Sequence, residues 1–266
     1  MIANILSIAG SDPSGGAGIQ ADIKAISANG AYAMAAITAL TAQNTRGVTG
    51  VTLTPPEMVA AQIAAIRKDI RVDAVKIGML GSAEITHAVA RALAGFTAPI
   101  VLDTVMVAKG GDRLLQADAV AALRDLLVPR ATVITPNLPE AADLLGEVEA
   151  EDEATMTRQA EALRRLGANA VLLKGGHLHG AQSRDLLQWA GGSVWVDAPR
   201  LHTANTHGTG CTLSAALAAQ LGRGAPLEDA LRTAKAYVTG AIAAAGQLSV
   251  GGGHGPTHHF HAMWEG

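Results

Sequence analysis

The chain has 266 residues, of which 49% are hydrophobic and only 3% are aromatic. This length and composition are typical of one large domain with a core of small apolar side chains, and we expect residues 1–266 to form a single domain. The formal net charge is −3 and no run of Lys or Arg occurs, which excludes the basic surface of a general nucleic-acid binder and favours small-molecule partners.

Cysteine usage and the N-terminal segment indicate the compartment. The one cysteine, Cys211, cannot form an intramolecular disulfide, and residues 1–13 lack the positive leader and cleavage site of a signal peptide. Residues 25–45 carry no charge over a length that can cross a bilayer, but polar residues such as Asn29 and Gln43 interrupt them, so we interpret them as strand and loop. We expect a cytoplasmic protein without a membrane span.

Short apolar segments alternate with amphipathic segments through the first two thirds of the chain. Strands are predicted at 4–9, 31–39, 73–78, 99–103, 131–136 and 169–176, and helices at 17–30, 55–70, 82–95, 117–128, 138–146 and 153–167. Segments 184–189 and 193–201 then predict a β-hairpin around a turn at 190–192. Two alanine-rich helices follow near 212–221 and 227–245. This order predicts an α/β fold with a parallel sheet covered by helices on both faces.

Glycine-rich or polar segments follow each of the six predicted parallel strands. They are, in chain order, GSDPSGGAG, TAQNT, GML, DTVMVAKGG, TPNLPE and KGGH. Ligands of open parallel sheets bind beyond the carboxyl ends of the strands, so these segments are expected to form one site.

Two glycine-rich segments are candidates for binding phosphate. Residues 16–21 fit the G-x-G-x-x-A form of a dinucleotide loop, but the glycines come several residues after the strand. No Asp or Glu occurs between Asp22 and Glu57 to bind the ribose, and no Walker G-x-x-x-x-G-K-[ST] is present, so neither device is favoured.

The second segment is THGTGCT, at the start of the helix near residue 212. Gly208 and Gly210 permit a tight turn whose N–H groups point one way, and the helix dipole adds positive potential, so an anion fits there. A glycine-rich helix start without a ligand is the alternative. At a helix N-terminus Cys211 is expected to have a lowered pKa. It is otherwise a small buried hydrophobe, or a covalent nucleophile if His207 acts as its base.

Eight fragments in this order resemble bacterial hydroxymethylpyrimidine/phosphomethylpyrimidine kinases over nearly the whole chain. They are AGSDPSGGAGIQADIKA, TALTAQNT, KIGMLGS, VLDTVMVAKGG, TPNLPEAADLLG, LLKGGH, NTHGTGCTLSAA and GGGHGPTHH. The resemblance implies a ribokinase-like three-layer α/β/α fold with a mostly parallel sheet, a β-hairpin in the C-terminal half and no separate lid domain. It also implies ATP and Mg²⁺, and two phosphorylations in thiamine biosynthesis: of 4-amino-5-hydroxymethyl-2-methylpyrimidine, then of its monophosphate. Similar enzymes are often homodimers, so we expect one here.

The same resemblance implies the catalytic residues. The GTGC turn is similar to the GAGD turn of sugar kinases, in which the aspartate is the base. Cys211 would then face the substrate hydroxymethyl group, and Gly208, Thr209 and Gly210 would form the anion hole. Lys174 is the expected cation for the ATP phosphates.

Further positions are implied for substrate, metal and nucleotide. Gly10, Gln43, Met79 and Val107 would contact the pyrimidine, with the Gln43 amide reading its ring nitrogen and amino group. Asp22, one turn beyond Gly18, would hold the substrate hydroxyl; the alternative is an ordinary solvated acid. The remaining positions are Asp103 and Glu140 for the metal, Asn137 for the nucleotide phosphates, and Thr203, Lys235 and Val238 for the rest of the nucleotide. Asn137 and Glu140 alternatively cap the next helix.

Two features depart from the family or stand outside its pattern. Thr104 replaces a proline that usually follows the aspartate, which frees an N–H and loosens that turn. The tail HGPTHHFH holds four of the nine histidines, but its Gly and Pro oppose helical zinc spacing, so an ordered turn near the nucleotide is favoured over a metal site.

Three other functions are considered. Pyridoxal kinase is the nearest alternative within the fold. A thiol enzyme using Cys211 covalently and a non-catalytic pyrimidine-binding module are alternatives from other classes.

Overall fold

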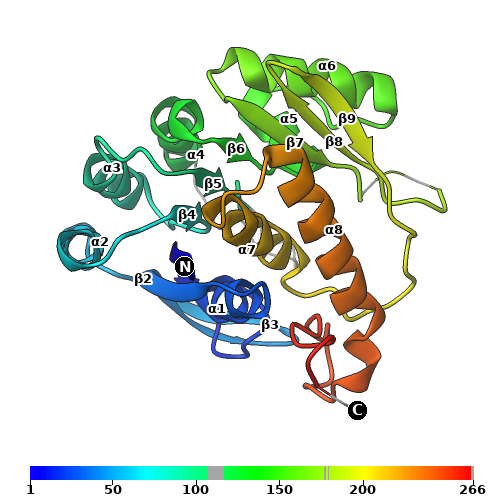
Figure 1. The fold of residues 1–266 in the computed structure, drawn as a ribbon, viewed down its shortest axis with the longest axis horizontal. Coiled ribbons are helices and arrows are strands. Elements are labelled where there is room, and N and C mark those ends of the chain that lie inside the picture. The colour runs from blue at the N-terminus through cyan, green and yellow to red at the C-terminus, as the bar shows by residue number, and fades with distance from the viewer. Residues whose placement is uncertain (107–116, 177, 179, 265–266) are drawn as a thin grey trace.

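The computed structural model describes residues 1–106, 117–176, 178 and 180–264. Three layers are visible, with one twisted sheet between two groups of helices (Figure 1). The predicted α/β/α architecture is therefore confirmed. Val107 lies outside the described residues, so its predicted contact with substrate stays a prediction.

Within the described residues the sheet has nine strands in the order β3-β2-β1-β4-β5-β6-β7-β8-β9. The parallel strands are β1 (Asn4–Ser11), β2 (Tyr32–Asn44), β4 (Ala74–Ile77), β5 (Ile100–Leu102), β6 (Val133–Ile134) and β7 (Ala170–Lys174). β3 (Gly47–Leu53) and β8 (Asp185–Trp189) run antiparallel to their neighbours, and β9 (Gly192–Val196) completes a hairpin with β8. The central strands are buried on both faces, which explains why their sequences are continuous apolar runs.

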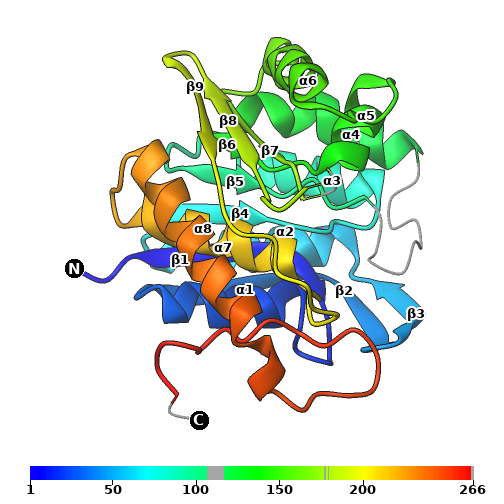
Figure 2. The same cartoon turned by 90° about the vertical axis from the view of Figure 1, so that its right-hand side faces the viewer.

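Two hydrophobic clusters fill the spaces on either side of the sheet. One is covered by α2 (Pro56–Asp69), α3 (Ala83–Ala92), α4 (Ala117–Leu126), α5 (Leu138–Leu145) and α6 (Glu153–Arg165). The other is covered by α1 (Gly18–Ala28), α7 (Thr209–Gly222) and α8 (Leu227–Ala243). Short 3₁₀ turns at Val128–Arg130 and Ala245–Gln247 follow α4 and α8. Residues 212–221 of α7 are all buried, because α7 lies between the sheet and α8 (Figure 2).

The order of the strands determines where a ligand site forms. β1 pairs with β2 on one side and with β4 on the other, so connections from this point leave in opposite directions. A crevice opens at the carboxyl ends of strands at such a switch point. The C-terminal segment returns to the same edge, where His207 pairs with Pro256 and the His254 amide donates to the Thr45 carbonyl oxygen at 2.8 Å.

The prediction from sequence did not include β3, and it placed the end of β2 too early. β2 extends to Asn44 instead of ending at 39, and β3 follows after a two-residue turn. The end of β2 alternates half-exposed and exposed side chains, and β3 is mostly exposed toward its end, so this part of the hairpin buries little. The predicted β8–β9 hairpin is confirmed. None of the helices in the described part of the chain has the length and apolarity needed to cross a membrane.

Candidate active site

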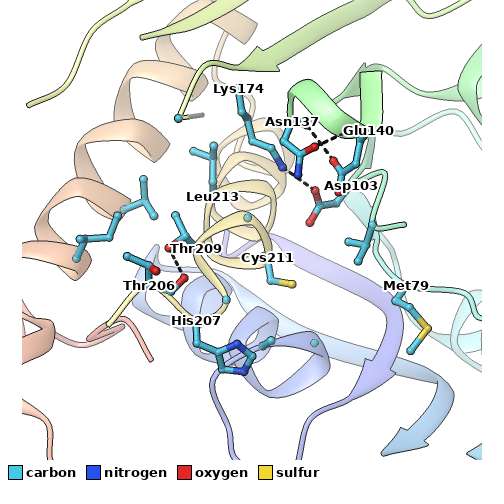
Figure 3. Close-up of a pocket in the computed structure, with 18 of the residues that line it drawn as sticks. Met79, Asp103, Asn137, Glu140, Lys174, Thr206, His207, Thr209, Cys211 and Leu213 are labelled. Atoms are coloured by element: carbon cyan, nitrogen blue, oxygen red, sulfur yellow. Dashed lines mark hydrogen bonds and ion pairs between the residues drawn. The ribbon is translucent and has the colours of Figure 1, made fainter. Parts of the chain in front are cut away.

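A cavity of about 840 Å³ opens at the carboxyl ends of β1, β4, β5 and β7 and at the start of α7. Its wall includes the following predicted site residues: Gly10, Gln43, Met79, Asp103, Asn137, Glu140, Lys174, Gly208, Thr209, Gly210, Cys211, Lys235 and Val238. In Figure 3 the Cys211 side chain leaves α7 on the side that faces Met79 and Asp103. The tertiary structure thus brings segments from both ends of the chain into one hollow.

The turn before α7 is shaped by Gly208. It caps the helix in the left-handed region, with φ 75° and ψ 11°, and a Cβ atom there would collide with the carbonyl oxygen of Gly16. The Thr209 hydroxyl donates to the Thr206 carbonyl oxygen at 2.8 Å and so closes the turn. Gly210 and Cys211 occupy the first turn of α7, where a helix offers no carbonyl partner to backbone N–H groups. Their amides are therefore suited to an anion in the cavity.

Asp12 organises the glycine-rich loop that packs against this turn. Its carboxylate accepts from the Ser14 and Ala17 amides, each at 2.9 Å, and its Oδ2 lies 2.8 Å from Nε2 of His207. Burial acts to raise the pKa of Asp12, but hydrogen bonds from His207 and Ser14 hold it below the usual value. Within this loop Gly16 packs closely on His207 and Gly208, where a Cβ atom would collide with the His207 ring. Sequence reasoning missed Asp12 as a site residue, although it stands in the conspicuous SDPSGG segment.

Cys211 does not have the lowered pKa that its position at a helix N-terminus predicted. Burial raises the pKa of the thiol to about 11, and the charges of Asp22 and Asp103 act in the same direction. The Lys76 ammonium and a hydrogen bond from the Gly18 amide oppose this rise. The free-energy cost of removing a thiolate from water is larger than the stabilisation that one helix dipole provides. The neutral thiol therefore predominates at pH 7.

Asp22 lies beneath the cavity and not on its surface, which contradicts its predicted contact with the substrate hydroxyl. Its side chain is fully buried, with Oδ2 2.9 Å from Nζ of Lys76 and 2.6 Å from the Ser7 hydroxyl that donates to it. Lys76, on β4, contributes to the cavity wall. Nothing in the sequence singled out this lysine, because one cation in the strand AVKI resembles an ordinary strand-end residue. α1 packs against β1 and β2, and its Asp22 side chain points inward to Ser7 on β1 and Lys76 on β4.

Asp103 and Lys174 form an ion pair in the wall of the same cavity. Asp103 Oδ1 accepts from Lys174 Nζ at 3.3 Å and from the Thr135 hydroxyl at 3.0 Å, and Oδ2 accepts from the Ser214 hydroxyl at 3.2 Å. Although burial acts to raise the pKa of Asp103, Lys174 and Lys76 hold it below the usual value. A hypothetical Cβ at position 210 would lie 3.4 Å from Lys174 Nζ. The ammonium therefore lies next to the glycine turn, as expected of a phosphate-binding cation.

Asn137 and Glu140 cap α5, as the alternative interpretation predicted, and both also contribute to the cavity wall. Asn137 Oδ1 accepts from the Glu140 amide at 2.8 Å, and Glu140 Oε2 accepts from the Asn137 amide at 2.9 Å. Thr104, at the position of the usual proline, donates its hydroxyl to Glu140 Oε2 at 3.1 Å. Burial raises the pKa of Glu140 to about 7, opposed by Lys174 and assisted by Asp103.

The cavity also extends between β8 and α8. Lys235 Nζ pairs with Asp185 Oδ2 at 2.6 Å, and Val238 is on the same face of α8. Thr203 is not part of the cavity wall, so its predicted contact with the nucleotide stays a prediction; its hydroxyl accepts from the Asn205 amide at 3.1 Å and holds a local turn.

The histidine-rich tail packs against the start of α7. The Gly255 carbonyl oxygen accepts from the His207 amide at 3.0 Å, and His259 Nε2 lies 3.1 Å from the Thr212 hydroxyl. Burial lowers the pKa of His259 to about 4. The tail therefore supports the two residues that flank the glycine turn.

The chain is similar to known proteins over nearly its whole length. A family model described as "Phosphomethylpyrimidine kinase" matches residues 12–258. The chain is 55% identical to the "Hydroxymethylpyrimidine/phosphomethylpyrimidine kinase" of Rhizobium meliloti (strain 1021), with 100% of each chain covered. The solved phosphomethylpyrimidine kinase of Clostridium difficile 630 is 40% identical with a TM-score of 0.80, covering 90% of this chain and 99% of that one. An ADP complex of Bacillus subtilis pyridoxal kinase is 35% identical with a TM-score of 0.90, covering 98% and 99%.

Proposed function

The chain belongs to the phosphomethylpyrimidine kinase family, and from this premise we propose how its cavity works. The protein phosphorylates 4-amino-5-hydroxymethyl-2-methylpyrimidine with ATP and then phosphorylates the monophosphate to the diphosphate, in thiamine biosynthesis. One observation supports this most strongly: the Gly208–Cys211 turn lies in a single cavity between Met79 and the Lys174–Asp103 pair. The whole chain acts as one kinase domain, because both hydrophobic clusters pack on the same sheet.

The pyrimidine binds at the end of the cavity formed by β1, β2 and β4. Gln43 supplies an amide that both donates and accepts, which suits a ring nitrogen next to an amino group. Met79 provides an apolar contact for the ring, and the absence of a side chain at Gly10 leaves space for Met79. Neutral polar groups and a thioether suit a neutral heterocycle.

The phosphoryl group passes across the glycine turn. Phosphoryl transfer requires mainly positioning and stabilisation of charge on the equatorial oxygens, and backbone amides with a nearby ammonium supply both. Gly208, Thr209 and Gly210 form the anion hole, and Lys174 neutralises the phosphates. The rest of the nucleotide extends toward Asn137 on one side and toward Lys235 and Val238 on the other.

Cys211 receives the proton of the substrate alcohol. The alcohol oxygen forms a bond to the γ-phosphorus as the bond to the ADP oxygen breaks, and the released proton passes to the thiolate and then to water. Because burial raises the pKa of Cys211 to about 11, only a small fraction of the free protein carries the thiolate at neutral pH. The sulfur therefore assists the transfer, while the anion hole and Lys174 carry most of it.

Magnesium is implied by the family, and the residues present fit it. Asp103 and Glu140 bring two carboxylates to one cavity, and a cation would stabilise the buried anion of Glu140, whose pKa is about 7. Among the described residues no cluster of three His, Cys, Asp or Glu forms a metal cage. Mg²⁺ commonly needs only one or two carboxylates beside substrate phosphates and water. Asp103 and Glu140 would hold the ion, which supplies charge neutralisation on the phosphates.

Product analysis by mass tests the function. Incubation with the pyrimidine alcohol, Mg²⁺ and ATP is expected to yield first the monophosphate and then the diphosphate, with one ADP released per step. Pyridoxal serves as the competing substrate, because the Bacillus subtilis relative is named a pyridoxal kinase. Preferential turnover of pyridoxal would contradict the proposed substrate, and no ADP release with either alcohol would contradict a kinase.

We also propose that the protein is cytoplasmic and that it forms a homodimer. The net charge of −3 favours the absence of nucleic-acid binding. β3 lies at one edge of the sheet, and Leu40, Val51 and Leu53 on β2 and β3 are 55%, 49% and 42% exposed. Exposed apolar side chains on an edge hairpin are typical of an interface. Light scattering is expected to give twice the chain mass for the parent and the chain mass for Val51→Glu. Val148→Glu, at another exposed valine, is the control, and equal masses for all three would contradict this interface.

A further inference from the structure

A buried ion pair lies next to the cavity that contains Cys211, and the proposed mechanism does not use it. Lys76 and Asp22 are both 0% exposed, and their Nζ and Oδ2 atoms are 2.9 Å apart. The Ser7 hydroxyl donates to Oδ2 at 2.6 Å, while Asp22 Oδ1 is buried without a hydrogen-bond partner. Burying two charges costs free energy that their attraction only partly offsets, so a stabilising role alone does not explain the pair.

The position of the ammonium places it at the cavity. A hypothetical Cβ on Gly78 would lie 2.7 Å from Lys76 Nζ and 3.0 Å from the Cβ of Ala9, so the side chain extends to the carboxyl ends of β1 and β4. Ala9, Lys76 and Cys211 all belong to the cavity wall. The only hydrogen-bond acceptor recorded for Nζ among the described residues is Asp22, although an ammonium has three donors.

We propose that Lys76 is a positioning residue that stabilises the thiolate form of Cys211, and that Asp22 limits this stabilisation; the inference rests on the proposed role of Cys211 as proton acceptor. The charged groups around the sulfur are Asp22 from α1, Lys76 from β4 and Asp103 after β5. Lys76 is the cation of the three. It is therefore the group that balances a negative charge on sulfur before the alcohol donates its proton.

One Coulomb attraction acts on the pKa values of both Lys76 and Cys211. Although burial acts to lower the pKa of Lys76, Asp22 and then Cys211 raise it above the usual lysine value. For Cys211, burial raises the pKa, Lys76 opposes this rise, and Asp22 adds to it. Removing Lys76 and removing Asp22 should consequently change the thiol in opposite directions. A pair without influence on the sulfur would change the thiol in neither variant.

The test uses the reactivity of Cys211, which is the one thiol in the chain. Iodoacetamide reacts with the thiolate, which displaces iodide and forms one S–C bond, so the alkylation rate below the pKa follows the thiolate fraction. At pH 8, without ATP or pyrimidine, we expect Lys76→Met to react about tenfold more slowly than the parent and Asp22→Asn about tenfold faster. The double variant is expected between them, and Lys68→Met, at an exposed lysine of α2, should match the parent.

Same-direction shifts in the two single variants, or no shift in either, would overturn the proposal. Thermal unfolding identifies a variant that fails to fold. If Lys76→Met does not fold, Asp22→Asn alone decides. Faster alkylation of Cys211 in Asp22→Asn than in the parent would then support the proposal, and an equal or slower rate would contradict it. Alkylation needs no kinase activity. Failure of this inference is therefore distinguishable from failure of the proposed function, which product analysis measures separately.

Discussion

Lys174→Ala is expected to lower kcat by about 10³-fold and to weaken ATP binding by about 10- to 100-fold. The Lys174 ammonium lies beside the glycine turn and is paired with Asp103, so its loss removes positive charge where charge develops on the phosphoryl group. The contribution to ATP binding is smaller, because a charge-assisted hydrogen bond contributes about 1.5–3 kcal/mol. Steady-state kinetics and ATP titration calorimetry measure the two effects.

Loss of the fold must be separated from loss of the charge in this variant. Removing one partner of a buried pair leaves Asp103 unpaired, which costs about 3 kcal/mol of stability. Thermal unfolding shows whether the variant remains folded at the assay temperature. Lys68→Ala, at an exposed lysine, is the matched control and should have parental kinetics. A folded Lys174→Ala variant with kcat within threefold of the parent would contradict the assignment.

Cys211→Ala is expected to lower kcat by about 10²-fold while the Kd of ATP remains unchanged. General base catalysis typically contributes 10²-fold or more, and the sulfur points toward Met79, where we propose that the pyrimidine binds and not the nucleotide. Rapid-quench measurement of the first phosphorylation reports the chemical step, and calorimetry reports the ATP affinity.

The pH dependence distinguishes a base from a packing role for Cys211. Because the pKa of the thiol is raised to about 11, the thiolate fraction increases about tenfold per pH unit between pH 7 and 10, and the chemical rate of the parent should rise with it. The rate of Cys211→Ala should be nearly flat over this range. A parental rate in the alanine variant, or identical pH profiles, would remove the assignment of Cys211 as the base.

Local sequence patterns were sufficient for most of the fold. Runs such as ATVITP and NAVLLK are continuous and apolar because their strands are buried on both faces, and the amphipathic segments between them cover the sheet. Glycines in THGTGCT indicated a tight turn at a helix start, and Gly208 indeed has a positive φ there. β3 was missed because a half-exposed edge hairpin has neither a continuous apolar run nor a strong alternation.

Contacts between distant segments account for what the sequence did not predict at the site. His207 and Asp12 are 195 residues apart, and Lys76 pairs with Asp22 across 54 residues. Asp22 was predicted to reach the substrate because it lies one turn from Gly18, but packing of α1 on the sheet directs it to Lys76 instead. Spacing along one helix shows which residues share a face; it does not show what that face packs against.

The sequence by itself determined the order of strands and helices, the glycine turn before α7 and the candidate residues at the ends of the strands. Backbone preferences and apolar periodicity act over a few residues, so they can be read locally. Only the tertiary structure decided the charge state of Cys211, the inward position of Asp22 and the burial of Lys76 in the wall of the cavity that contains Cys211. These properties depend on the exclusion of water and on Coulomb interactions across the fold, which arise only when distant segments pack together.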